Sequence, residues 1–102
     1  MMKVSELQGA ALDWAVAKAI GEYKPVAVPN YSTEWAQGGP IIEREEISVN
    51  WANGQWQAHT VNDQDEYEQI EYGPTPLIAA MRVFVASKLG DEIEVPNELI
   101  GE

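Results

Sequence analysis

The residue types best suited to bind a ligand gather between Tyr31 and Glu45, where hydroxyl, amide, aromatic and guanidinium groups share one stretch. The Gly-Gly-Pro sequence at 38–40 predicts a loop, because glycine adopts backbone angles that other residues avoid. Successive N–H groups of such a loop can converge on an anion or a polar group. The side chains can hydrogen-bond a polar ligand or stack on a planar one. The predicted ligand-binding residues are Tyr31, Ser32, Thr33, Trp35, Gln37, Gly38, Gly39 and Arg44.

A purely structural interpretation of the same stretch stays open. Trp35 would anchor a long connection to the core, and Arg44 would pair with a nearby glutamate. The glycines match neither a phosphate-binding P-loop nor a dinucleotide-binding fingerprint, because the glycine spacing, the following lysine and the preceding strand are missing.

Catalytic and metal-binding patterns are weak. The chain has no cysteine and one histidine, so neither a thiolate nor a histidine-based metal site is expected. Asp63 and Asp65 start like a calcium loop, but the glycine at its sixth position and the acid at its twelfth are absent. His59 faces Ser48 through predicted strand pairing, which needs no catalytic explanation. We therefore expect no catalytic residues, no metal and no cofactor.

Charge restricts the partners. With 17 acidic and 6 basic residues the net charge is -11, which argues against direct nucleic-acid binding. Eight acidic residues could instead form a negative patch that binds a basic host protein or mimics nucleic acid. No stretch has the length of a membrane span, so a cytoplasmic protein is expected. The acids of this predicted patch are Asp63, Asp65, Glu66, Glu68, Glu71, Asp91, Glu92 and Glu94.

Two helices are predicted to hold the site. The first covers about residues 6–20, opened by a capping box from Ser5 to Gln8 and closed by Gly21. A largely irregular segment follows, with a short edge strand over 26–28. The second helix begins at Pro76 behind a Thr75 cap and ends before Gly90.

A hairpin supplies the centre of the predicted sheet. Asn53-Gly54 is the sequence that a two-residue type I′ turn requires. This turn pairs Trp51 with Trp56, which puts the apolar residues of both strands on one face. A third strand is expected at 69–72, a last short strand at 92–95, and a flexible tail at 96–102.

These elements predict an α+β fold: a single domain over 1–102 with two helices packed on one face of a small antiparallel sheet. The apolar helix faces, including Leu12, Ile20 and Phe84, would cover the sheet at residues such as Trp51. The opposite sheet face and the sheet edges remain available for a homodimer or a higher homo-oligomer.

Three segments, Leu12–Ala17, Trp35–Glu43 and Gly73–Arg82, resemble in this order the NinX-like family of small lambdoid phage and enterobacterial prophage proteins. The resemblance implies an accessory role in the cytoplasm of an infected bacterium and supplies no catalytic residues. With the predicted loop, it favours binding or sequestration of a small polar, nucleotide-like ligand, as in countering host defence signalling. The alternative is an acidic module that inhibits a host protein.

Overall fold

The fold is organised around one buried helix. The computed structural model describes residues 1–22, 25, 27–61 and 67–99. Its long elements are α1 (Gly9–Ile20), α2 (Trp35–Glu45), β2 (Ser48–Ala52), β3 (Gln55–Val61), β4 (Tyr67–Gly73) and α3 (Pro76–Leu89). Its short ones are β1 (Met2–Lys3), η1 (Val4–Glu6), β5 (Glu92–Ile93) and η2 (Asn97–Leu99).

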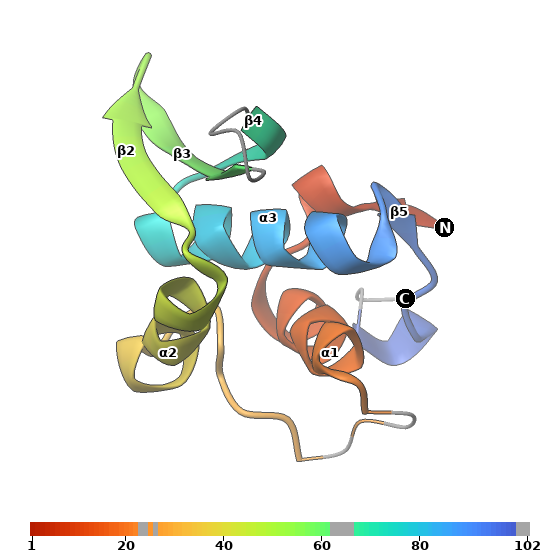
Figure 1. The fold of residues 1–102 in the computed structure, drawn as a ribbon. Coiled ribbons are helices and arrows are strands. Elements are labelled where there is room, and N and C mark those ends of the chain that lie inside the picture. The colour runs from red at the N-terminus through yellow and green to blue at the C-terminus, as the bar shows by residue number, and fades with distance from the viewer. Residues whose placement is uncertain (23–24, 26, 62–66, 100–102) are drawn as a thin grey trace.

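Helix α3 lies between the sheet and the other two helices (Figure 1). An unbroken run from Ala79 to Ala86 is buried, so α3 is enclosed on nearly all sides rather than along one stripe. The sheet packs on one side of α3, and α1 and α2 pack on the other. The α+β fold class is therefore confirmed, but the expected packing of the first helix against the sheet differs: α1 rests on α3.

The hairpin forms in the predicted register. Trp51 pairs with Trp56 and Ser48 with His59, and β4 extends the sheet in the order β2-β3-β4. Asn53 and Gly54 have φ of 54° and 82°, as a type I′ turn requires. The two indole rings meet edge to face with centroids 5.4 Å apart. Trp51 is nevertheless 59% exposed, because β2 lies at the edge of the sheet, where α3 contacts it less than β3 or β4.

Helix boundaries agree with the sequence signals except at the start of α1. The Thr75 Oγ1 atom accepts a hydrogen bond of 3.1 Å from the Ile78 N–H, so the predicted cap of α3 is confirmed. Gly21 ends α1 as predicted. The capping box is wrong: Ser5 belongs to η1, and Gln8 occupies the N-cap position without a side-chain cap. Ile20, expected in the core, is 44% exposed at the end of the helix.

The remaining differences concern the short elements. Ala27 and Val28 are not in a strand, and residue 26 of that predicted strand lies outside the described residues. β5 pairs with β1 in a separate two-stranded ribbon, so residues 2–3 lie beside residues 92–93. After β5, the Leu99 side chain in η2 packs against the core, and 100–102 lie outside the described residues. Among the described residues, no helix is long and apolar enough to cross a membrane.

Candidate functional site

The predicted binding loop is mostly a helix. Tyr31, Ser32 and Thr33 form a turn, and α2 begins at Trp35, so the loop prediction for 35–45 is wrong. Neither Gly38 nor Gly39 has a positive φ, which removes the nest of converging N–H groups. Local propensity opposes a helix at Gly-Gly-Pro, but packing against α3 overrides it.

Gly38 shows why this helix needs its glycine. A Cβ atom at Gly38 would lie 2.7 Å from the Leu77 Cδ1 atom and would collide with the Tyr31 carbonyl oxygen. A Cβ atom at Gly39 would meet nothing closer than the Trp35 ring, at 3.8 Å. Gly38 therefore permits close packing of α2 against α3 and the preceding turn.

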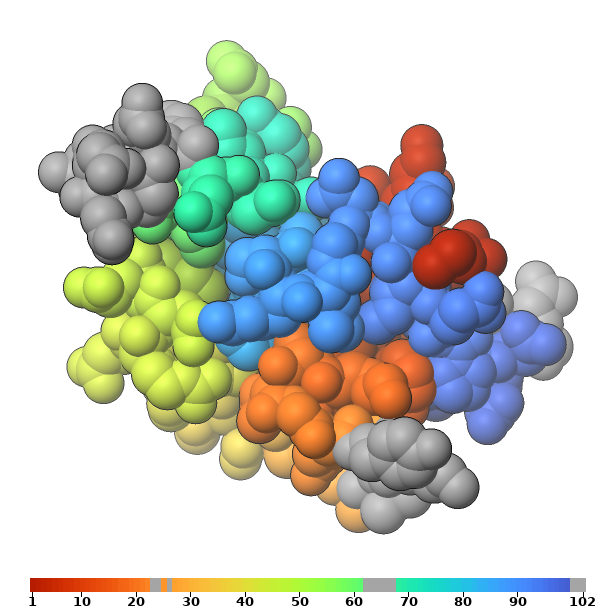
Figure 2. All heavy atoms as spheres, turned by 45° about the vertical axis from the view of Figure 1, so that its right-hand side comes forward, coloured from red at the N-terminus to blue at the C-terminus, as the bar shows by residue number. Residues whose placement is uncertain are grey.

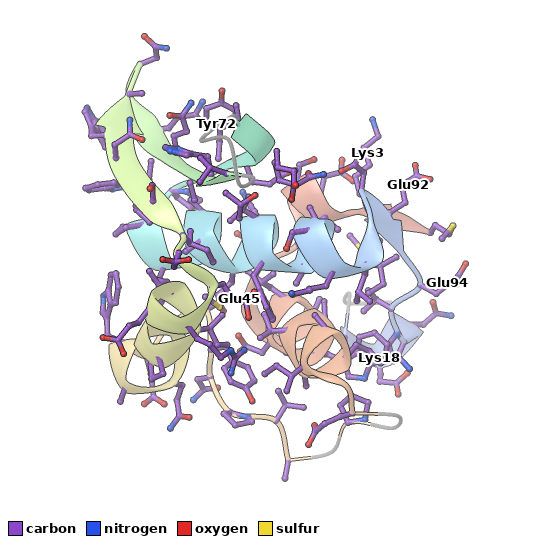
Figure 3. The ribbon with its side chains drawn as sticks, viewed as in Figure 1. Lys3, Lys18, Glu45, Tyr72, Glu92 and Glu94 are labelled. Atoms are coloured by element: carbon purple, nitrogen blue, oxygen red, sulfur yellow. The ribbon has the colours of Figure 1, made fainter. Side chains whose placement is uncertain are left out.

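The predicted ligand-binding side chains that belong to α2 are those of Trp35, Gln37 and Arg44, and all three are exposed on its surface. Trp35 is 55% exposed, and Gln37 is exposed as well. The Arg44 Nε atom lies 3.1 Å from the Glu45 Oε2 atom, as in the structural interpretation. The Lys88 Nζ atom lies 3.1 Å from the Glu45 Oε1 atom, which joins α3 to α2. Glu45 is labelled in Figure 3.

Two pKa shifts accompany this arrangement. Partial burial acts to raise the pKa of Glu45, but hydrogen bonds from Lys88 and Arg44 outweigh it and leave the pKa below its ordinary value. Burial and the Glu22 carboxylate raise the pKa of Tyr31 against the opposing effect of Arg44. Tyr31 therefore stays protonated at neutral pH.

A hollow of about 590 Å³ lies beside α1, next to the turn formed by residues 31–33. Three segments line it: the first half of α1, part of the chain between residues 25 and 33, and the C-terminal segment. In the space-filling view, α1 (orange) and the C-terminal segment (blue-violet) adjoin on one face of the molecule (Figure 2). The lining residues are Gly9, Ala10, Asp13, Trp14, Pro25, Ala27, Val28, Asn30, Thr33, Pro96, Glu98 and Leu99.

Asp13 and Trp14 give this hollow its chemistry. Asp13 is only 5% exposed, and its Oδ1 atom accepts a hydrogen bond of 2.7 Å from the Ser32 backbone N–H. This bond fixes the 31–33 turn against α1. Trp14 is half-buried, and the Lys18 Nζ atom lies 5.9 Å from the centroid of its ring, within cation–π range. The hollow thus combines an aromatic face with a carboxylate.

Sequence reasoning found only part of this hollow. Of the eight predicted site residues, Thr33 lines it, and Ser32 contributes through its backbone. The Ser32 side chain is 1% exposed, and its Oγ atom makes no hydrogen bond within the described residues. Asp13 and Trp14 were missed as site residues. The available signal was a carboxylate within an alanine-rich helical face, where an uncompensated charge is costly.

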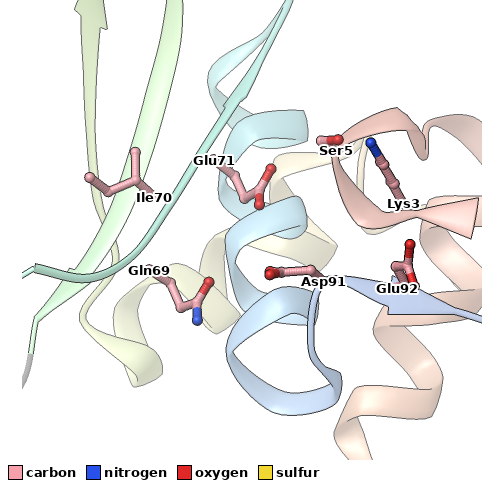
Figure 4. Close-up of a pocket in the computed structure, with 7 residues that line it drawn as sticks. All are labelled: Lys3, Ser5, Gln69, Ile70, Glu71, Asp91 and Glu92. Carbon is pink, nitrogen blue, oxygen red and sulfur yellow. The ribbon is translucent and has the colours of Figure 1, made fainter.

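A second hollow, of about 710 Å³, lies between β4 and the β1–β5 ribbon. The Glu71 and Asp91 side chains extend into it, and Lys3 and Glu92 stand at its edge (Figure 4). Burial, and then the Asp91 carboxylate, raise the pKa of Glu71, with Arg82 acting in the opposite direction. The structure therefore brings together three acids of the predicted patch, while its residues 63–66 lie outside the described part of the chain.

Arg82, which acts electrostatically on Glu71, has a structural role. It is 9% exposed; its Nε atom donates to the Leu7 carbonyl at 2.8 Å, and its Nη1 atom to the Tyr72 carbonyl at 2.7 Å. Burial lowers the pKa of Arg82, and Glu71 partly offsets this effect. Among the described residues, no group of three or more histidines or acids could hold a metal ion.

Comparison with known proteins identifies the family. A family model described as "Bacteriophage P22, NinX" matches residues 20–88, which is more than half of the chain. This span contains α2, the three-stranded sheet and nearly all of α3, and it stops short of Asp13 and Trp14. No curated protein matches the chain. The expected resemblance is confirmed: the chain belongs to the NinX family of bacteriophage P22.

Proposed function

We propose that this phage protein binds a small planar molecule in the hollow beside α1, and so sequesters a signal molecule in the cytoplasm of the infected bacterium. The observation that carries the proposal is the placement of Trp14 and the buried Asp13 in the wall of one hollow. Its volume of about 590 Å³ falls within the size range of small-molecule sites.

The lining determines the class of ligand. The Trp14 ring offers a face on which a planar group can stack, and Pro25, Val28 and Leu99 add apolar surface. Asp13 accepts hydrogen bonds, so it favours a ligand with N–H donors. Glu98 adds a second carboxylate, and no lysine or arginine is among the lining residues described.

This lining changes the nucleotide-like expectation. A phosphate group placed beside Asp13 and Glu98 would be repelled, whereas a nucleobase or heteroaromatic amine would not. We therefore assign the hollow to a base-like ring and leave any phosphate outside it.

Native mass spectrometry of protein purified from infected cells tests the proposal. The wild-type protein should carry a small molecule, and Trp14→Leu should lose it. Trp35→Leu is the matched control, because Trp35 is 55% exposed on α2 and belongs to the site first predicted. A bare wild-type mass, or a ligand lost from Trp35→Leu and kept by Trp14→Leu, would refute the assignment.

The acidic hollow supports a second candidate, an interaction module for a basic protein. Its specific observation is the gathering of Glu71, Asp91 and Glu92 around one space. A basic side chain entering it would relieve the repulsion between Glu71 and Asp91. Salt-sensitive capture of a basic host protein, abolished by Glu71→Gln with Asp91→Asn and retained by Trp14→Leu, would favour this function over ligand binding.

A further inference from the structure

The outer edge of β2 lacks the features that protect exposed strands. β2 pairs with β3 on one side, and no strand of the described chain pairs with its other side. Its sequence, Ser-Val-Asn-Trp-Ala, has no charged residue and no proline, and its pairing with β3 has no irregularity. Natural proteins usually protect such edges with charges, prolines or bulges.

The opposite edge of the sheet shows the contrast. β4 carries Glu68 and Glu71, and its pairing with β3 is irregular at Thr60 and Val61. These features discourage another strand from pairing with β4. The open side of β2 is therefore the edge suited to pairing.

The backbone of β2 is arranged for this pairing. In an antiparallel ladder, alternate residues direct their N–H and C=O groups towards the partner strand. The two-residue turn makes Ala52–Gln55 the closing hydrogen-bonded pair, so Val49 and Trp51 direct theirs away from β3. The backbone N–H and C=O groups of both residues are therefore available for hydrogen bonds at the open edge of β2.

The strand is complementary to itself. Antiparallel pairing centred on Asn50 uses all five residues and places Val49 opposite the Trp51 of a second copy, twice. An aromatic residue opposite a β-branched residue is a favourable cross-strand pair. Trp51 is 59% exposed despite its contact with Trp56, so its indole has surface left to bury.

Charge favours the same place. Each chain carries a net charge of -11, so most contacts between two copies would bring carboxylates together. Pairing along β2 brings no carboxylates opposite each other, because β2 contains no acidic residue. We propose that β2 pairs antiparallel with β2 of a second copy about a two-fold axis at Asn50, which gives a dimer with one continuous six-stranded sheet.

A single cysteine tests the axis directly, because the chain contains none of its own. Residues facing each other in a non-hydrogen-bonded antiparallel pair have Cα atoms about 4.5 Å apart, which a disulfide can span. Asn50→Cys should therefore form a covalent dimer under mild oxidation at least about tenfold faster than Glu92→Cys, an exposed position on β5. Equal rates would overturn the proposal.

Sedimentation equilibrium provides the second test. The wild-type protein should dimerise, and more strongly at about 0.5 M than at about 0.1 M salt, because salt screens the repulsion between the chains. Asn50→Asp places two like charges at the axis and should weaken the dimer at least about tenfold. Gln57→Glu adds the same charge to the neighbouring β3 position and should weaken it much less.

Two results contradict edge pairing. A wild-type chain that stays monomeric up to about 1 mM at both salt concentrations would exclude the dimer. Equal loss of dimer in Gln57→Glu and Asn50→Asp would place the contact on the open sheet face, where Tyr72 points away from α3 (Figure 3).

Discussion

Helices α1 and α2 pack on the same side of α3, yet they are held there in different ways. α1 buries the residues on both sides of Trp14, 11–13 and 15–17, and Asp13 ties it to the 31–33 turn. α2 buries only Gly38 and Ile41, with Ile42 partly buried against the core, and most of its other residues are exposed. Most of the ligand-binding residues predicted from the sequence lie on α2 or in the turn before it, whereas the hollow that we propose as the binding site lies beside α1. The two helices thus differ in how they are held: α1 by buried residues and a buried hydrogen bond, and α2 by close packing at Gly38.

Loss of Arg82 should have the largest effect on stability, and this effect should be concentrated in α1 and the residues that precede it. Arg82→Met would leave the Leu7 and Tyr72 carbonyls without their present donor, which should lower the free energy of unfolding by about 3 kcal/mol. Leu7 precedes α1, so amide exchange should accelerate in η1 and α1 more than in α2. Urea unfolding and hydrogen exchange measure both effects, and equal acceleration in α2 would show that the two sides are not independent.

Substitution of Gly38 should destabilise the packing of α2. Gly38→Ala must displace the Tyr31 backbone or the Leu77 side chain and should destabilise the protein by about 1–3 kcal/mol. Gly39→Ala meets no close atom and should stabilise the helix by about 0.5–1 kcal/mol. Thermal unfolding of this matched pair checks the packing of α2, and shifts of the same sign would contradict it.

Asp13 links α1 to the start of α2, because it accepts a hydrogen bond from Ser32, which lies in the turn before α2. Asp13→Ala leaves the buried Ser32 N–H without its acceptor and should destabilise the protein by about 1–2 kcal/mol. Asp13→Asn keeps an acceptor oxygen and should lose less. If chemical denaturation shows the two variants to be equally stable, the hydrogen bond does not hold the turn.

The smallest effects concern pH. The lowered pKa of Glu45 means that its stabilising contribution is present at neutral pH and is lost as the pH falls through its folded-state pKa. The raised pKa of Glu71 has the opposite consequence: stability is lost as the pH rises from the unfolded-state to the folded-state pKa.

Two glutamine variants separate these effects. At about pH 7, Glu45→Gln should be slightly less stable than wild type and Glu71→Gln slightly more stable, each by less than about 1 kcal/mol. As the pH falls, the Glu71→Gln difference should disappear first, because the pKa of Glu71 is raised, and the Glu45→Gln difference should persist to lower pH, because the pKa of Glu45 is lowered. Melting temperatures across this range provide the measurement, and a stabilising Glu45→Gln at neutral pH would contradict the α2–α3 link.

Local signals predicted much of the fold. The hairpin register, the Thr75 cap and the glycine that ends α1 depend on a few neighbouring residues, and each is confirmed. Helix α2 could not be predicted in this way, because it packs against α3, which is distant in sequence, through a close approach at Gly38. The β1–β5 ribbon was missed for the same reason: Met2 and Ile93 come from opposite ends of the chain.

The candidate site was predicted less well than the fold. A hollow is a property of several segments at once, and its wall here joins α1, the 25–33 segment and η2. Of the residues predicted from the sequence, Thr33 lines this hollow, whereas Trp35, Gln37 and Arg44 lie on α2. Our proposal places the site at the buried Asp13, and its burial depends on the tertiary fold, which the local sequence does not reveal.

Indole N–H resonances of the ¹⁵N-labelled protein test the central claim most directly, because Trp14 and Trp35 report on the two sides separately. The low-mass extract of infected cells should shift the Trp14 resonance and leave that of Trp35 in place. In Trp14→Leu, the extract should shift none of the remaining indole resonances. A shift at Trp35 with an unmoved Trp14, or no shift at either residue, would contradict ligand binding in the hollow beside α1.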